Sequence, residues 1–406
     1  MMLSSNTILL TFMYESFQAF QPHFDALARV GYFKIVSKRE VKWKDTLHYY
    51  YRIFIWICVI AYNLQHIVRA IQARSCTKQL VGTLFILLTT LNTLGKQLSF
   101  NVRVKRVDNI INLINDSLFA PKNAYHEDVM RSNALSMSRL LTVYHIAIYI
   151  CSVLFIAYPL IDKALGNDVY LTGYVPFDTS VSPTFEIAAT YLGVLISLQG
   201  YGHVTMDCTI VAFYAFATIQ LQIVRYNLEH LADEFKYEGI FKIFADDDLE
   251  LRQILHKKIV QCIKHYRKIV WYVREIESIF SEAMIVQFFI VAWVICMTLY
   301  KIVELPLFSA EFVSMAMYLG CMLAQLFIYC YYGTHLRVES ELVNESIYQS
   351  DWLTLSPSYR RRLLVMMERC KRTIEPRIAR VIPLSVDTYI SVLRSSYALF
   401  TILNRK

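Results

Sequence analysis

Charged residues are scarce in this chain of 406 residues: Asp, Glu, Lys and Arg make up 18%, whereas hydrophobic residues make up 56%. Together with a mean hydropathy of +0.37, this balance excludes an ordinary soluble protein and indicates that much of the apolar surface faces lipid. Glycine and proline are also few, at 11 and 9 residues, and no repeat, low-complexity tract or linker is visible. We therefore expect residues 1–406 to form a single membrane domain.

Motifs of catalysis and cofactor binding are absent. The sequence has no HExxH, paired CxxC or GxSxG pattern, and no phosphate loop or dinucleotide fingerprint. Most of the nine cysteines lie inside apolar runs, so no disulfide framework is expected. We predict that the protein is not an enzyme and that it needs no metal or cofactor.

Seven long segments, six of them strongly apolar, predict an all-α membrane protein with seven transmembrane helices. The predicted spans cover about residues 49–69, 79–98, 138–161, 185–218, 279–302, 311–335 and 384–403. Each is close to or longer than the roughly 17 to 25 residues that cross a bilayer. Lys96 lies near the end of the second span, where its long stem can carry the charge to the membrane surface. Membrane lipid is therefore one expected partner.

The basic residues predict the orientation of the chain. Most of the 41 Lys and Arg residues lie in the N-terminal segment and in every second connection between the spans. Because such residues concentrate in cytosolic loops, we expect a cytosolic N-terminus and an extracellular C-terminus. This distribution accounts for the net charge of +8 without a nucleic-acid partner.

Helical periodicity continues beyond the spans on the predicted cytosolic side. It predicts helical extensions that form a cytosolic anchor over about residues 219–278 and 336–383. Amphipathic helices of this kind need partners for their apolar faces. The partner is either the rest of the same chain or another subunit.

The last span differs from the others because it contains Asp387 and Arg394. A charge near the centre of a spanning helix costs about 2.5 to 3.5 kcal/mol on insertion scales, so this helix should be sheltered by protein or water. One stripe of the helix is small and polar in its middle and apolar toward its end, which is typical of a pore with an apolar gate. The stripe consists of Thr388, Val392, Ser395, Leu399 and Ile402. The alternative is a buried seventh helix without a pore.

Aromatic and small polar residues in the outer halves of the spans predict a ligand cavity. An apolar cavity with a few hydroxyls suits a small, volatile, weakly polar molecule. The candidate lining residues are Phe85, Tyr149, Ser152, Phe155, Tyr191, Leu195, Phe312, Met315 and Tyr318. Ordinary helix packing is the alternative for each of them, because aromatic side chains commonly fill cores.

A row of polar residues lies on one face of the fourth span. His203 and Asp207 are spaced four residues apart, and Gln199 lies one turn earlier. A metal site or an acid–base centre needs more ligands than these. We therefore favour hydrogen bonds to neighbouring helices, because polar groups within a membrane need protein partners.

The C-terminal sequence resembles the signature of insect odorant receptors. The resemblance is carried by SIYQSDWLTLSP (residues 346–357), RRRLLVMMER (360–369), PLSVDTY (383–389) and SSYALFTIL (395–403). It implies an odorant-binding subunit of a ligand-gated, non-selective cation channel in the plasma membrane of sensory neurons. In that family a tuning subunit assembles with a co-receptor as a heterotetramer, and the last helices line the pore. The gate would then lie near Leu399, Ile402 and Leu403.

Three other functions share part of this pattern. A gustatory-type homomeric ligand-gated channel has a similar architecture, but the Ser-Tyr-x-x-Phe-Thr ending favours the odorant branch. A G-protein-coupled receptor would need an external N-terminus, which the basic residues contradict. A transporter would be expected to have paired broken helices or an inverted repeat, and neither is visible.

Overall fold

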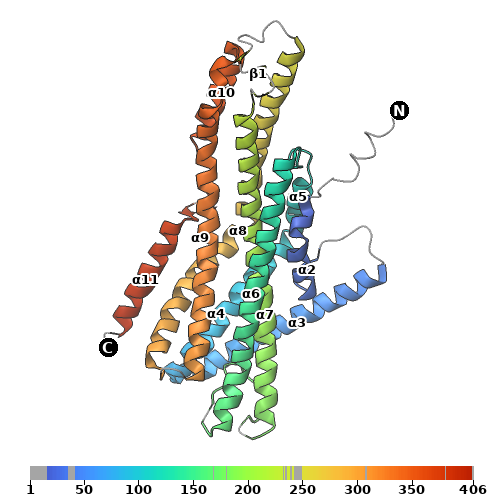
Figure 1. Ribbon diagram of the computed structural model, residues 1–406. Helices are drawn as coiled ribbons and strands as arrows, with labels where there is room; N and C mark the ends of the chain where they lie inside the picture. Colours follow the sequence, from blue (N-terminus) through green and yellow to red (C-terminus); the bar gives the residue numbers. More distant parts are fainter. Residues whose placement is uncertain are drawn as a thin grey trace.

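The computed structural model describes residues 16–34, 42–167, 169–179, 181–231, 233, 236–237, 240–241, 249–306, 309–379 and 381–404. Long helices dominate the described chain, and most of them run along the length of an elongated bundle (Figure 1). The long helices are α3 (Lys42–Gln72), α4 (Thr77–Val102), α6 (Ala124–Ala164), α7 (Thr184–Glu229), α8 (Leu249–Glu304), α9 (Ala310–Gln349) and α11 (Val386–Asn404).

Among the described residues, five helices are long and apolar enough to cross a membrane. These are the helical segments Asp45–Ser75, Ala124–Ala164, Thr184–Glu229, Gln253–Val303 and Glu311–Gln349. The predicted all-α membrane fold is therefore confirmed in its coarse form. The second and seventh predicted spans coincide with α4 and α11, which are helical but do not belong to these five.

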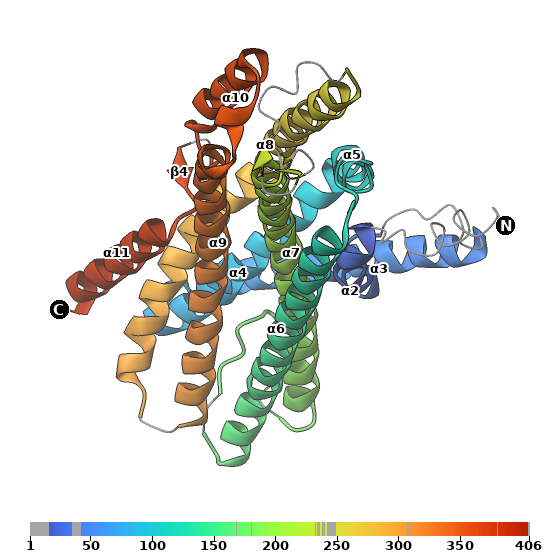
Figure 2. The same cartoon turned by 45° about the horizontal axis from the view of Figure 1, so that its top comes forward.

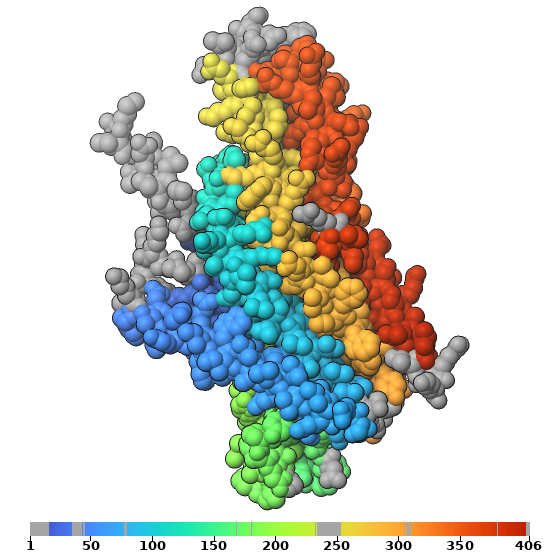
Figure 3. Space-filling model, turned by 180° about the vertical axis from the view of Figure 1, so that it is seen from behind, coloured from blue at the N-terminus to red at the C-terminus, as the bar shows by residue number. Residues whose placement is uncertain are grey.

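Helix α7 forms the centre of the molecule. In the most apolar stretch of α7, 94% of the residues are buried, compared with 11% in α6 and 33% in α9. Helices α3, α4, α6, α8 and α9 all contact α7. In Figure 3, α3 (blue) and α4 (cyan) cross the back of the molecule beside α8 (yellow to orange). A helix surrounded in this way is apolar on all sides, which explains why the hydrophobic pattern of α7 has no single face.

Short-range interactions set the starts of several helices. The side chain of Asn123 accepts a hydrogen bond of 2.8 Å from the backbone N–H of His126 and so caps α6. Ser309 caps α9 in the same way through the N–H of Phe312, at 3.1 Å. Such caps satisfy backbone donors that the first helical turn leaves free.

Beyond the predicted spans, the chain forms further helices at one end of the bundle. Helices α7, α8 and α9 continue into this region, where α10 (Pro357–Cys370) packs against α8 and α9 (Figure 1). The short helix η4 (Trp352–Thr354) precedes α10, and α5 (Val104–Ile114) packs against α8. Helices thus cover most of the described part of the predicted extensions, whereas their role as an anchor and their cytosolic location stay predictions.

The predicted anchor is not helical throughout. Two antiparallel strand pairs occur there: β1 (Lys236–Tyr237) with β2 (Ile240–Phe241), and β3 (Arg377–Ile378) with β4 (Ile382–Pro383). The second pair lies directly before α11. Pro376 precedes this pair and Pro383 ends it. Because proline lacks the backbone donor that a helix needs, a continuous helix is excluded here.

Two elements near the N-terminus complete the core, and the sequence analysis did not anticipate them. They are the short helices η1 (Ser16–Phe20) and α2 (Gln21–Arg29), followed after α3 by η2 (Ala73–Ser75). The ring of Phe20 lies 5.3 Å from that of Phe213 and 5.6 Å from that of Phe216, both on α7. Phe24 is also buried. The N-terminal helices therefore close one side of the bundle.

Helix α11 lies at the edge of the molecule, beside α8 and α9 (Figure 2). The start of α11 packs closely against α9. The N–H of Val386 donates to the Thr334 hydroxyl at 3.0 Å, and Leu384 lies so close to Gly333 that any side chain at position 333 would clash with the Leu384 carbonyl. Farther along, the Ser396 hydroxyl donates to the Ala292 carbonyl at 3.1 Å. The remaining face of α11 is exposed and includes both Asp387 and Arg394.

Candidate functional site

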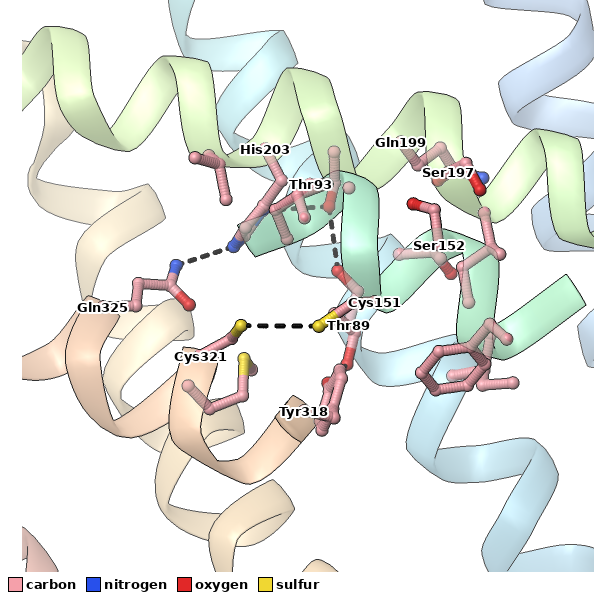
Figure 4. A pocket seen from close by; sticks show the side chains of 18 of the residues that line it. Thr89, Thr93, Cys151, Ser152, Ser197, Gln199, His203, Tyr318, Cys321 and Gln325 are labelled. Atoms are coloured by element: carbon pink, nitrogen blue, oxygen red, sulfur yellow. Dashed lines mark hydrogen bonds between the residues drawn. The ribbon is translucent and has the colours of Figure 1, made fainter. Parts of the chain in front are cut away.

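Four helices, α4, α6, α7 and α9, enclose a cavity of about 90 Å³ (Figure 4). It lies within the stretches of these helices that were predicted to span the membrane. The lining residues are Phe85, Ile86, Thr89, Thr90 and Thr93 from α4; Tyr144, Ile148, Cys151, Ser152 and Phe155 from α6; Ile196, Ser197, Gln199, Gly200, His203 and Val204 from α7; and Tyr318, Cys321, Met322 and Gln325 from α9.

The structure brings together four of the nine candidate ligand-binding residues. Phe85, Ser152, Phe155 and Tyr318 all line the cavity. The rings of Phe85 and Tyr318 lie 4.5 Å apart, and those of Phe155 and Tyr318 lie 6.2 Å apart. The Tyr318 hydroxyl is hydrogen-bonded to the Thr89 hydroxyl at 2.7 Å. The three rings form an aromatic wall, and the one hydroxyl on these rings is already paired.

The other five candidates do not line this cavity. Tyr149 is 74% exposed and Tyr191 is 42% exposed, whereas Met315 is buried outside the cavity, and Leu195 and Phe312 are half-buried. These candidates miss the cavity because of the direction in which each side chain points around its helix axis. At 3.6 residues per turn, Tyr149 and Phe155 point about 120° apart on α6 and cannot both face one narrow cavity.

One end of the cavity is closed by a polar network around His203. Its Nδ1 lies 2.9 Å from the Thr93 hydroxyl, and its Nε2 lies 2.7 Å from the amide nitrogen of Gln325. Because Gln325 offers a donor to Nε2, this ring nitrogen accepts and Nδ1–H donates to Thr93. Thr93 in turn donates to the Thr89 carbonyl at 3.0 Å. The network thus joins α4, α7 and α9.

A buried ion pair lies directly behind His203. The Lys96 ammonium contacts the Asp207 carboxylate, and the side chain of Lys96 is fully buried. Asp207 also accepts hydrogen bonds from Gln325 and from the Tyr329 hydroxyl, the latter at 2.6 Å. Such additional donors are what make a charge pair tolerable in a low-dielectric interior.

Two sequence-based expectations are decided by this network. The interhelical hydrogen bonds predicted for His203 and Asp207 are confirmed. The surface location predicted for the Lys96 charge is wrong: instead of reaching the membrane surface, this side chain turns inward to neutralise Asp207. The charge on Asp207 supplies the physical reason, because an unpaired carboxylate in this position would be far more costly.

A pair of cysteines spans the cavity. The Sγ atoms of Cys151 on α6 and Cys321 on α9 lie 3.6 Å apart. Both residues line the cavity, and both are free thiols (Figure 4).

Within the described residues there is no cluster of three or more side chains that could hold a metal ion. Because the lining is mostly apolar, with a few hydroxyl and amide groups, the cavity is suited to binding a small apolar molecule with one or two polar atoms.

The candidate pore residues lie apart from this cavity, on α11. Thr388 and Val392 are half-buried, whereas Ser395, Leu399 and Ile402 are exposed. The side chain of Leu403 lies outside the described part of the structure. In a single chain, the later part of the predicted stripe is thus exposed at the edge of the molecule, whereas its first two residues are partly covered.

Comparison with known proteins identifies the family. A model described as 7tm Odorant receptor matches residues 77–397. Odorant receptor 59a of Drosophila melanogaster is 22% identical over 403 residues, covering 96% of this chain and 98% of that protein. Odorant receptor 46a, isoform A, of the same species is 22% identical over 371 residues, covering 90% and 93% respectively.

Solved structures share the same fold. The insect olfactory receptor OR5 from Machilis hrabei, determined in complex with eugenol, superposes with a TM-score of 0.81. The match covers 96% of this chain and 98% of that chain at 14% sequence identity. With the family model matching most of the sequence, the chain belongs to the insect odorant receptor family.

Proposed function

We propose that this protein is the odorant-binding subunit of a ligand-gated, non-selective cation channel in the plasma membrane of sensory neurons. The observation that carries the proposal is the pairing of two features in one chain. One is a largely apolar cavity between α4, α6, α7 and α9. The other is a helix, α11, whose charged and polar face is left uncovered.

The proposed topology has seven spanning helices, with the N-terminus in the cytosol and the C-terminus outside the cell. The connections between successive long helices alternate between the two ends of the bundle (Figure 1), which supports a chain that crosses repeatedly. The end that carries α5 and α10 also carries the basic side chains Lys264, Arg267 and Arg362. The positive-inside tendency places such an end in the cytosol.

The odorant is proposed to occupy the four-helix cavity. Phe85, Phe155 and Tyr318 supply aromatic surface for dispersion contacts, and Ser152 supplies a hydroxyl. The related receptor OR5 was solved with eugenol, a small aromatic molecule, which supports a ligand of this general size. Because the cavity of this chain is only about 90 Å³, its ligand is either very small or displaces side chains as it binds.

The exposed face of α11 supports assembly with other subunits. Arg394 near the centre of α11 would cost about 2.5 to 3.5 kcal/mol if the helix faced lipid, whereas a pore at a subunit junction gives it water. We propose that this chain forms a heterotetramer with co-receptor subunits, with the α11 helices around the central axis. The pore stripe is Thr388, Val392, Ser395, Leu399 and Ile402, continued by Leu403.

The test combines expression with cysteine accessibility. Cells expressing this chain with an insect odorant co-receptor should give odorant-evoked cation currents, and Ser395→Cys should make them sensitive to a water-soluble thiol reagent added during activation. Tyr397→Cys is the matched control, because it is exposed on the single chain but lies about 200° around the helix from Ser395. Currents that require a guanine nucleotide and a G protein would refute the channel. Equal currents without the co-receptor would instead favour a homomeric channel of the gustatory type.

A further inference from the structure

Gln199 is a buried amide with no hydrogen-bond partner. It lies on α7, only 2% of its surface is exposed, and it lines the cavity. Neither its amide nitrogen nor its amide oxygen has a partner within the described residues. Figure 4 shows Gln199 with Ser197 and Ser152 on the opposite side of the cavity from the His203–Gln325 pair.

The neighbouring polar side chains of α7 are satisfied, so Gln199 stands apart from them. One turn along, His203 bonds to Thr93 and Gln325. Ser197 donates to the Gly193 carbonyl at 2.6 Å. Among the described cavity-lining residues, the half-buried Tyr144 also has a buried hydroxyl without a partner.

An unpaired amide in an apolar cavity destabilises the protein, because the group has lost its water and gained nothing in return. Nearly all buried polar groups in folded proteins are paired, and those that are not call for a specific explanation. A ligand that brings its own polar atom into the cavity restores the missing hydrogen bonds. Since both ends of the amide are unpaired, this conclusion holds for either orientation of the side chain.

We propose that the amide of Gln199 binds the polar atom of the ligand, and that the ligands of this receptor are small hydrocarbons bearing a hydroxyl or carbonyl oxygen. This inference rests on the proposed odorant site. A hydroxyl accepts from Nε2 and donates to Oε1, whereas a carbonyl only accepts. Alcohols and phenols are therefore preferred over ketones, and ketones over hydrocarbons of equal shape. The hydrocarbon body lies against Phe155 and Ile196.

The test uses pairs of compounds that differ only at the polar atom: benzyl alcohol with ethylbenzene, 1-hexanol with heptane, and 2-heptanone with 2-methyl-1-heptene. Binding to the purified full chain and odorant-evoked current in the co-expressed complex are both measured. The wild type should prefer the oxygenated member of each pair by about tenfold or more, and Gln199→Leu should remove that preference. A factor of ten corresponds to about 1.4 kcal/mol, the upper range for one neutral hydrogen bond.

A control variant and a melting experiment separate ligand binding from a structural role. Thr209→Val is the matched control on α7: Thr209 is buried but does not line the cavity, and its hydroxyl already bonds within the helix, so the preference for oxygenated compounds should persist. Gln199→Leu without ligand should melt at or above the temperature of the wild type, because no internal hydrogen bond is lost. A clearly lower melting temperature would refute the proposal.

The outcomes also distinguish this inference from the proposed function. If the compounds bind and Gln199→Leu keeps the wild-type preference, the role of Gln199 is refuted while the odorant site stands. If Tyr144→Phe, and not Gln199→Leu, removes the preference, the assignment to Gln199 is likewise refuted. If no compound of any pair binds or evokes current, the odorant site in this cavity falls, and the role of Gln199 falls with it.

Discussion

Replacing Lys96 with methionine is expected to destabilise the protein by about 3 kcal/mol. The side chain of Lys96 is fully buried and neutralises Asp207, so the variant leaves a buried carboxylate without its counter-ion. Breaking a buried ion pair from one side typically costs about 3 to 5 kcal/mol. The lower end applies here, because the Tyr329 hydroxyl and the Gln325 amide still donate to Asp207.

The loss can be measured as a change in melting temperature of the purified full chain. With an unfolding entropy of about 2.1 cal/mol/K per residue, about 3 kcal/mol lowers the melting temperature of a chain of this length by about 4 °C. Lys371→Met is the matched control: Lys371 pairs with Glu368 at 2.7 Å, but the two side chains are 64% and 73% exposed. Exposed pairs contribute less than about 1 kcal/mol, so this variant should melt near the wild type.

A double variant tests whether the charge of Asp207 causes the loss. Asp207→Asn removes the charge but keeps an oxygen that accepts from Tyr329 and Gln325. Lys96→Met combined with Asp207→Asn should therefore recover most of the stability that Lys96→Met alone has lost. The reasoning is refuted if Lys96→Met melts like the wild type, or if the double variant is no more stable than the single one.

Three other predictions concern different parts of the molecule. Burial, and to a smaller extent the nearby charge of Lys122, lowers the pKa of His265 to about 3. Below about pH 6.5 the unfolded chain therefore takes up a proton that the folded chain does not, and the free energy of unfolding should fall from pH 6.5 toward pH 4 by at most about 1.4 kcal/mol per pH unit. His265→Gln should flatten this slope in thermal melts. Mild oxidation with copper phenanthroline should join Cys151 to Cys321, whose Sγ atoms lie 3.6 Å apart, and so block the odorant response. The Cys321→Ser variant should stay responsive after the same treatment. An odorant response that survives a disulfide confirmed by mass spectrometry would contradict the proposed cavity. Leu399→Ser should raise the current in the absence of odorant, because a polar side chain wets an apolar gate; an unchanged resting current would place the gate elsewhere.

The long helices were predictable because each follows from a local property of the sequence. Segments such as 138–161 and 311–335 contain no charge over most of their length, and the structure has α6 and α9 there. The strand pair β3–β4 and the helices η1 and α2 were not anticipated. Their hydrophobic patterns are short, and what stabilises η1 and α2 is contact with distant residues, such as Phe20 with Phe213. Local periodicity carries no information on such contacts.

The candidate site was only partly predictable, because the sequence does not determine how each helix is rotated about its axis. Ser152 and Phe155 face the cavity, but Tyr149, one turn before Ser152, is exposed. Spacing along a helix shows which residues share a face, and a hydrophobic face is clear only when the opposite face is polar. In helices that contact both lipid and protein, both faces are apolar, so the inward direction is lost from the pattern.

The polar row on α7 shows where sequence reasoning succeeds and where it stops. Polar groups are costly within a membrane, so the spacing of His203 and Asp207 was sufficient to predict bonds to other helices. It could not identify the partner, because Lys96 near the end of its span equally fits a side chain that reaches the membrane surface. The choice between these positions is a balance between the hydration of the Lys96 ammonium and its attraction to Asp207, which depends on the distance between α4 and α7.

Gln199 also carries polar groups that are costly to bury within a membrane, yet no partner for them is found among the described residues. In the proposal made above, the ligand supplies the hydrogen bond that Gln199 lacks.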